Sequence, residues 1–393
     1  MRPLRRLVPS LLLALLTAAA APARAAEPVD FVAEARLLAR IVACTDTEAP
    51  LPAGVDPKVV ASHCREMKRA MTKYKDRWLA TARPFIAGLV PAGLPATVVY
   101  PFGGADLNNA LAVYPDAAEI TTLSLEYSGD PRTITTLRGG ALATSLRLTA
   151  QFVGKLIAVN HNRTLDLERL VMDAVPAPLV FALVGLGLHD RELVSVHAFT
   201  LADDGAVRYL TADDLAAIDR DLALAPTPAK RRAASNAAFP HVEVRFRKRA
   251  TASAPAGPVQ VFRHLRANLA NDHFGPDTAV GRHLAAKGRV AAMTKAASYL
   301  LWRGAFTNVR SWLLANMIWM ISDSTGPPPS AATAAGFVQD VWGHFNGAAF
   351  AAPSDGGGEL VRYFATQPAR KLPFFFGYPD RANRAHLVVT RRP

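Results

Sequence analysis

Two glycines and two carboxylates occur at a spacing that is typical of nucleotide-binding folds. Segment 101–106 has the sequence Pro-Phe-Gly-Gly-Ala-Asp, which contains Gly103, Gly104 and Asp106. Glycine allows backbone conformations and close approaches that a side chain would prevent. Glu126 follows about 20 residues after Asp106, where a Rossmann fold places the acid that binds a ribose hydroxyl. These four residues predict a ligand-binding turn of the kind that takes a nucleotide or S-adenosylmethionine.

A simpler interpretation of the same segment is structural. The G-x-G-x-x-G pattern is absent, and two adjacent glycines are a weak signal without it. Asp106 directly precedes an expected helix, which its carboxylate could cap by accepting a backbone N–H bond. An exported compartment also lacks such cofactors as a rule, so we expect no cofactor. The pattern therefore favours a tight turn in which the topology is kept and the cofactor is lost.

Three acids are candidates for acid–base catalysis. Asp106 and Glu126 are two of them, and the third is Asp323, in the Ser-Asp-Ser-Thr-Gly-Pro segment at 322–327. A hydrolase could use such carboxylates to transfer protons, and Ser324 would be a candidate nucleophile if a histidine lay beside it. The same segment also fits a plain turn, and no G-x-S-x-G motif is present. The histidines lack metal-ligand spacing, and we expect no metal site.

The amino terminus has the pattern of a cleavable signal peptide. Three arginines precede an apolar run at 11–21, and an Ala-Arg-Ala motif ends at residue 25. The run is too short to remain as a membrane-spanning helix of about 20 residues. We expect cleavage of 1–25, no transmembrane segment in the mature chain, and a periplasmic or secreted protein.

Export also favours pairing of the two cysteines. Cys44 and Cys64 lie 20 positions apart, and disulfides persist in oxidising compartments. The apolar spacing over 31–44 and 57–86 predicts a helical hairpin that a Cys44–Cys64 bond would close. A bond over a loop of this length contributes about 3 kcal/mol in the chain-entropy model.

The remaining chain alternates expected strands and helices. A strand at 96–100, a helix at 107–113 and a strand at 120–125 form a βαβ unit, which predicts parallel pairing. Further expected elements are a helix at 138–159, strand pairs at 194–201 with 206–210 and at 242–247 with 259–265, a helix pair within 281–321, and strands at 372–376 and 386–390. The expected fold is α/β, with a Rossmann-like, mainly parallel sheet, an N-terminal helical hairpin and antiparallel additions. The expected division is a signal peptide at 1–25, a helical hairpin region at 26–95 and an α/β domain at 96–393, with 220–258 as a candidate insertion.

The chain has an excess of positive charge. The formal charge is +13, and removal of 1–25 with its four arginines lowers it to +9. Such a charge can attract anionic partners, but the basic residues are mostly spread out and their pattern favours a solvated face. The candidate partners are a small polar or anionic ligand and an anionic polymer of the cell envelope. No nucleic-acid-binding motif is present, and we expect no nucleic-acid partner. The hydrophobic share of 50% excludes a disordered chain.

Several segments resemble a group of uncharacterised exported bacterial proteins with a Tyr-Pro-Phe-(Ser/Gly)-Gly-x-Asp signature. Here Tyr100-Pro-Phe-Gly-Gly-Ala-Asp106 is similar to that signature, with two glycines where the group usually has one. Further similar segments are 114–116, 123–126, 295–300, 323–327 and 372–378. The resemblance covers roughly 75–393 in the same order. It implies an exported protein and carries over neither an activity nor a catalytic residue.

Three functions follow from these patterns, and the sequence leaves open whether the protein is an enzyme. The first is a domain that binds a small polar or anionic ligand at 101–106 and Glu126, or a degenerate Rossmann-like domain that has lost its cofactor. The second is hydrolysis by carboxylates at the carboxyl ends of the strands. The third is a structural role, in which the positive surface adheres to an anionic envelope polymer.

Overall fold

The computed structural model describes residues 26–159, 175–295, 297–345, 357–377 and 384–393, so the predicted signal peptide lies outside the described residues. The strands are β1 (Thr97–Pro101), β2 (Glu119–Ser124), β3 (Arg191–Leu201), β4 (Val207–Tyr209), β5 (His241–Lys248), β6 (Gln260–Arg266), β7 (Val290–Thr294), β8 (Met317–Ser322), β9 (Val338–Gly343) and β10 (His386–Arg391). They form one sheet in the order β4-β3-β5-β6-β2-β1-β7-β8-β10-β9. The fold is therefore α/β, as the sequence predicts.

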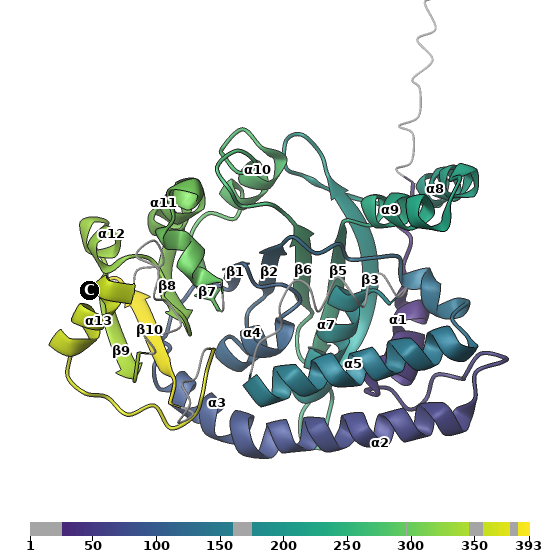
Figure 1. Cartoon of the computed structure of the whole chain (residues 1–393), viewed down its shortest axis with the longest axis horizontal. Coiled ribbons are helices and arrows are strands. Elements are labelled where there is room, and N and C mark those ends of the chain that lie inside the picture. The colour runs from purple at the N-terminus through teal and green to yellow at the C-terminus, as the bar shows by residue number, and fades with distance from the viewer. Residues whose placement is uncertain (1–25, 160–174, 296, 346–356, 378–383) are drawn as a thin grey trace, which may run out of the picture.

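The helices form a layer on each face of this sheet (Figure 1). They are α1 (Val32–Leu38), α2 (Pro57–Tyr74), α3 (Ala80–Ala87), α4 (Leu107–Val113), α5 (Gly139–Val159), α7 (Ala177–Leu188), α8 (Ala212–Leu224), α9 (Pro228–Ala238), α10 (Ala279–Ala285), α11 (Thr307–Asn316), α12 (Pro329–Ala334) and α13 (Gly357–Thr366), with the short turns η1 (Ala39–Ala43), η2 (Lys75–Leu79), η3 (Pro131–Thr135), η4 (Ser298–Trp302) and η5 (Gly304–Phe306). Side chains of α1, α2, α4, α5 and α7 share one hydrophobic core, and those of α10, α11 and α12 share a second. Val98 belongs to the first core and its neighbour Val99 to the second, as the alternation of a strand requires.

The centre of the sheet is parallel and its flanks are antiparallel. Strands β6, β2, β1, β7 and β8 pair in parallel. Thr97 of β1 lies opposite Glu119 of β2, which confirms the predicted parallel pairing of this βαβ unit across α4. Strands β4, β3 and β5 extend one side as antiparallel neighbours, and β10 and β9 extend the other. The sheet is thus mixed, and the expectation of a mainly parallel sheet holds only for its centre.

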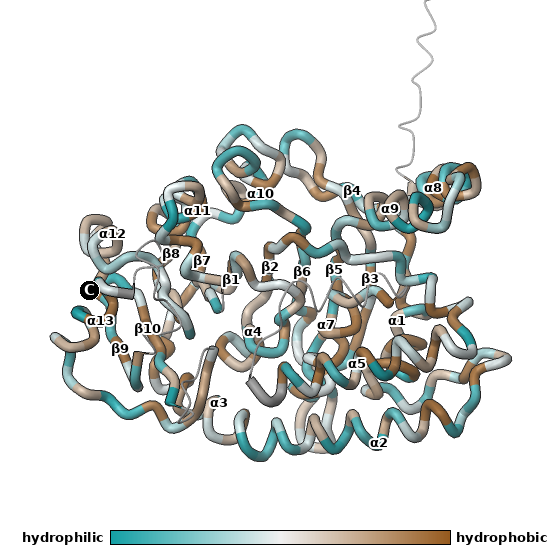
Figure 2. Tube along the Cα trace, in the orientation of Figure 1, coloured by the Kyte–Doolittle hydropathy of each residue, from teal (hydrophilic) through white to brown (hydrophobic). Residues whose placement is uncertain are grey.

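The expected helix pair over 281–321 is wrong. This stretch contains α10, β7, α11 and β8. Both strands lie between two helical layers, so their residues are apolar on both faces and lack the alternation that identifies a half-buried strand. Figure 2 shows brown, hydrophobic stretches in the middle of the molecule, among them much of helix α7, which contains no polar side chain. Segment 372–376 is also not a strand, whereas β9 is a strand that the sequence did not predict.

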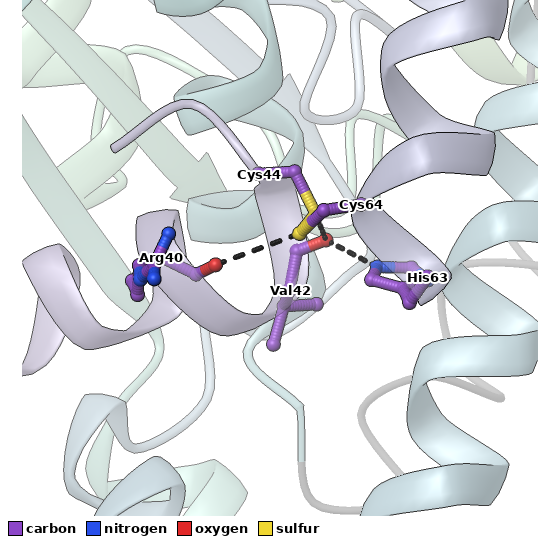
Figure 3. The surroundings of a disulfide bond; sticks show 5 residues. All are labelled: Arg40, Val42, Cys44, His63 and Cys64. Atoms are coloured by element: carbon purple, nitrogen blue, oxygen red, sulfur yellow. Dashed lines mark hydrogen bonds between the residues drawn. A yellow bond between two sulfur atoms is a disulfide. The ribbon is translucent and has the colours of Figure 1, made fainter. Parts of the chain in front are cut away.

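The amino-terminal helices pack into the first core and are tied together by a disulfide. Cys44 ends η1 and pairs with Cys64 of α2, with their Cα atoms 5.2 Å apart, which confirms the predicted bond (Figure 3). Beside the disulfide, His63 Nε2 lies 2.8 Å from the carbonyl oxygen of Val42. The bond is compatible with an extracellular location.

Helix α2 is an amphipathic helix with a well-defined start. Asp56 accepts a hydrogen bond from the backbone of Lys58 at 2.8 Å, and Pro57 occupies the first helical position. Its buried residues are Val60, His63, Met67, Met71 and Tyr74. This spacing of three to four directs one face to the core and leaves the other exposed.

The segment 220–258 contains the end of α8, helix α9 and strand β5. Strand β5 pairs with β3 and with β6, so this part of the segment lies inside the sheet. Within the parts of the chain that the structure describes, every helix is too short or too polar to traverse a lipid bilayer.

Candidate functional site

The chain changes direction in the sheet at β1. From β1 it proceeds to β2 and β6 on one side, and it later crosses to β7 and β8 on the other. In open α/β sheets, ligands bind outside the carboxyl ends of the strands at such a switch point. A ligand-binding site is therefore expected among the residues that follow β1, β2, β7 and β8.

After β1, Asp106 is held as the N-cap of α4. Its carboxylate accepts a hydrogen bond from the backbone N–H of Asn109 at 3.2 Å, and the Asn109 amide donates to both oxygens at 2.8 Å. The hydroxyl of Tyr100 donates to Oδ2 at 2.9 Å. Burial raises the pKa of Asp106, and Lys295 and the hydrogen bonds oppose that effect. The capping interpretation of Asp106 is confirmed.

The glycines of the same turn have local packing reasons. A Cβ atom on Gly103 would lie 2.7 Å from the ring of Tyr100, and Gly104 has a φ of 53° in the left-handed region. The backbone N–H of Gly103 also donates to the carbonyl of Leu123 in β2 at 3.1 Å. The turn is thus folded tightly against the ends of β1 and β2.

Lys295, which directly follows β7, joins two of the predicted acids. Its Nζ lies 3.9 Å from Asp106 Oδ2 and 3.4 Å from Asp323 Oδ2, which follows β8. The side chains of Lys295 and Asp323 are 3% and 0% exposed. The ammonium also lies 4.5 Å from the ring centroid of Phe376. A Cβ on Gly377 would lie 2.5 Å from Asp323 Cγ, so this residue must be a glycine for the segment to reach the cluster.

Lys295 is not among the site residues that the sequence predicts. The available signal is a lysine at the carboxyl end of an apolar segment, Val-Ala-Ala-Met-Thr at 290–294. Because the sequence predicts a helix pair over that segment, it does not indicate that Lys295 follows the carboxyl end of a strand. Buried charges in proteins are paired, and the pairing here brings Asp106 and Asp323 together.

A chain of buried polar groups continues from this cluster to the surface. Tyr74 donates its hydroxyl hydrogen to Asn109 Oδ1 at 3.2 Å and accepts from Asn108 Nδ2 at 2.7 Å. His189 Nε2 lies 3.2 Å from Asn108 Oδ1, and Arg83 donates to His189 Nδ1 at 2.9 Å. Since Nδ1 accepts, the Nε2 atom carries the hydrogen. Burial and the nearby Arg83 lower the pKa of His189 to about 3, which keeps this ring neutral.

Glu126 lies in a separate polar group after β2. The residue is 3% exposed, and its Oε2 atom has no hydrogen-bond partner among the described residues. Its backbone oxygen lies 3.0 Å from Nε2 of His264 in β6, whose Nδ1 lies 3.1 Å from the carbonyl of Gly104. Burial lowers the pKa of His264. Within the described chain, no hydrogen bond or ion pair joins Glu126 to Asp106 or Asp323, so the three candidate acids do not form one cluster.

A groove of about 1150 Å³ lies beside the Lys295 cluster, between the end of α2, η2 and the segments 369–375 and 384–385. We call it the basic groove. Its charged lining residues are Lys73, Arg77, Arg370, Lys371 and Arg384. No aspartate or glutamate is among the described residues that line it. In the described chain, Lys73, Arg77 and Lys371 form no ion pair, whereas Arg370 pairs with Asp340 at 3.0 Å.

Aromatic side chains separate the basic groove from the Lys295 cluster. Tyr74 and Trp78 line the groove, and their rings stack with centroids 5.1 Å apart. Trp78 also stacks on Phe376 at 5.8 Å, which is the ring that Lys295 faces. The indole N–H of Trp78 donates to the carbonyl of Phe375 at 2.6 Å. One aromatic layer therefore lies between the groove and the buried charges.

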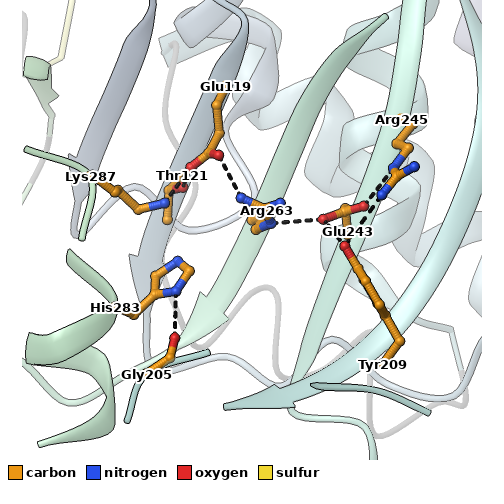
Figure 4. Close-up of polar contacts among 9 residues, drawn as sticks. All are labelled: Glu119, Thr121, Gly205, Tyr209, Glu243, Arg245, Arg263, His283 and Lys287. Carbon is orange, nitrogen blue, oxygen red and sulfur yellow. Dashed lines mark hydrogen bonds and ion pairs between the residues drawn. The ribbon is translucent and has the colours of Figure 1, made fainter. Parts of the chain in front are cut away.

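A second ionic network lies at the opposite end of β2 (Figure 4). Arg263 bridges Glu119 at 2.6 Å and Glu243 at 2.7 Å, and Lys287 pairs with Glu119. Burial raises the pKa of Glu119, but Lys287 and Arg263 outweigh it and lower the pKa to about 2. Glu243 also accepts from the Tyr209 hydroxyl at 2.7 Å. Each acid has cationic partners, so this network acts as a structural link between β2, β5 and β6.

The described residues contain no group of three or more histidine, cysteine, aspartate or glutamate side chains that could hold a metal ion. Comparison of the chain with protein-family models, with curated proteins and with solved structures returned no match.

Proposed function

We propose that the protein is an exported, Rossmann-like binding protein and that its ligand is an anion held in the basic groove. The observation that carries this proposal is the lining of the groove, which has five cationic side chains and no carboxylate among the described residues. A concave site of one charge sign concentrates its field and attracts ligands of the opposite sign. The volume of about 1150 Å³ suits an organic anion or a short segment of an anionic polymer.

The strand order supports a Rossmann-like ancestry. Read across the sheet, β6, β2, β1, β7 and β8 are the third, second, first, fourth and fifth parallel strands along the chain, which is the order of a Rossmann sheet. The turn after β1 does not fit a dinucleotide, because the Tyr100 ring fills the space beside Gly103 and Asp106 is engaged by Asn109 and Tyr100. We therefore propose a domain that has kept the topology without the cofactor.

The carboxylates support binding better than hydrolysis. A hydrolase needs two titratable groups within hydrogen-bond reach of one reacting position. Asp106 is engaged as a cap, and Lys295 lies between it and the fully buried Asp323. Glu126 belongs to a different polar group. The acids thus fit a structural role that fixes the aromatic layer behind the groove.

The test is a pair of matched variants on one helical stretch. Lys73→Ala with Arg77→Ala removes two cations from the groove, and Lys68→Ala with Arg69→Ala removes two exposed cations of α2 that do not line it. Inositol hexakisphosphate serves as a compact polyanionic probe in calorimetric titrations, with myo-inositol as the neutral control. Surface electrostatics is strongest at low ionic strength, so titrations at two salt concentrations reveal its contribution.

We expect the groove variant to lose at least tenfold in affinity and the matched variant to bind almost as the wild type does. Equal losses in the two variants would assign binding to the overall positive charge and would refute the groove. Absence of saturable binding to the wild type would refute an anionic ligand of this class.

A further inference from the structure

A second, smaller cavity of about 320 Å³ lies away from the basic groove, at the outer part of the sheet. Its walls come from α1, the turn at 45–48 that follows Cys44, the end of α7, the start of β3 and the end of β5. Four arginines line it, namely Arg36, Arg191, Arg247 and Arg249. We call it the arginine cavity.

The feature that points to a ligand is Arg191, the first residue of β3. This residue is 7% exposed, and its Nη2 donates to the carbonyl of Pro115 at 2.6 Å. Its Nε is buried and has no hydrogen-bond partner among the described residues. Native proteins seldom leave a buried donor without an acceptor, so such a donor often marks the place where an ion or a water molecule binds. For a guanidinium donor the fitting acceptor is the oxygen of an anion.

The other arginines of the cavity leave positive charge uncompensated. Arg36 and Arg249 form no ion pair within the described chain. Arg247 is the exception, because its Nε pairs with Glu192. The cavity therefore offers three cations without a carboxylate partner among the described residues.

Three acids, Asp46, Glu48 and Glu192, also line the cavity, so its four arginines exceed its carboxylates by one. Asp46 Oδ1 accepts hydrogen bonds from the backbone N–H groups of Glu48 at 2.7 Å and of Ala49 at 3.3 Å, which folds the turn. Glu48 is exposed and makes no side-chain bond in the described residues. Thr45 and Thr47 add hydroxyl groups that can donate to an anion.

We propose that the arginine cavity binds a small tetrahedral oxyanion, of the class of phosphate or a phosphate ester, with the Arg191 guanidinium as its buried donor. Arginine suits this task because its planar fork of N–H groups matches the oxygens of a phosphate. The volume is at the lower end of the range for small-molecule sites and is sufficient for a small ester. The site is separate from the basic groove and does not depend on it.

The test titrates inorganic phosphate and, separately, glycerol 3-phosphate into the full mature chain at constant ionic strength. Arg36→Gln with Arg249→Gln removes two exposed cations whose loss leaves the core intact. Arg191→Lys keeps the charge but lacks the Nε donor. The groove variant Lys73→Ala with Arg77→Ala is the control for the other site.

We expect saturable phosphate binding to the wild type, a loss of at least tenfold in both arginine-cavity variants, and an unchanged affinity in the groove variant. Tighter binding of glycerol 3-phosphate would assign the ligand to esters, and tighter binding of phosphate would assign it to the free anion. Loss in the groove variant alone would overturn this inference while supporting the groove. Wild-type affinity in both arginine-cavity variants, or no saturable binding at all, would also overturn it.

Discussion

Replacement of Lys295 by methionine tests the charge cluster at the switch point. The substitution keeps an unbranched apolar stem and removes the ammonium that lies 3.4 Å from Asp323 and 3.9 Å from Asp106. Asp323 is fully buried, so water cannot replace the lost partner. Removal of one member of a buried ion pair costs about 3–5 kcal/mol, because the other charge stays buried without that partner. We expect a loss of that size in the free energy of unfolding at pH 7.

Urea denaturation at pH 7, with the disulfide intact, measures this loss. The double variant Lys295→Met with Asp323→Asn also removes the carboxylate charge of Asp323, so it should recover part of the loss and reveal the coupling in a double-mutant cycle. Because protonation neutralises a carboxylate, the cost of Lys295→Met should also shrink as the pH is lowered. A loss below about 1 kcal/mol, or a double variant no better than the sum of the single ones, would refute a charge cluster that stabilises the fold.

Three further predictions concern other parts of the fold. Thiol titration of the denatured protein should find no free cysteine, and two titratable thiols would contradict the pairing. Replacement of Cys44 and Cys64 by serine should cost about 3 kcal/mol of stability in urea melts. The pKa of Glu119 is lowered to about 2 in the folded chain, so the contribution of this carboxylate to stability is complete above its ordinary pKa and is lost as the pH falls toward 2. Acid denaturation of Glu119→Gln should lack this part of the pH dependence. An acid denaturation profile equal to that of the wild type would contradict this role of Glu119. Asp106→Ala should lose more stability than the roughly 1 kcal/mol of a helix cap, because it also removes the acceptor of Tyr100 and a partner of Lys295. Asp106→Asn retains the cap and should lose less. Equal melting curves of Asp106→Ala and wild type would contradict the capping role.

Local signals predicted the parts of the fold that depend on neighbours in the chain. The glycine turn and the apolar segments on either side of α4 gave the parallel pair β1 and β2. The expected strand pair at 194–201 and 206–210 corresponds to the antiparallel pair β3 and β4. The cysteine pair followed from the expected compartment, and the structure confirms the pair.

The site required information that neighbouring residues do not hold. Lys295 meets Asp106 and Asp323 only because β7 lies between β1 and β8, and the apolar composition of β7 did not distinguish it from a buried helix. The basic groove likewise combines Lys73 and Arg77 of the amino-terminal helices with a segment near the carboxyl end. In the sequence these cations are dispersed, and only the tertiary fold gathers them.

Tyr74 is part of the wall of the basic groove and also part of the hydrogen-bond network of α4, and this double role has a thermodynamic consequence. Its ring forms part of the wall of the basic groove, while its hydroxyl holds the two asparagines that begin α4. A guest molecule that shifts the ring must disturb those amides, and a change in α4 must reshape the wall. Linkage then requires that each event alter the free energy of the other by the same amount. Ligand binding in the basic groove and the stability of α4 are therefore expected to be coupled.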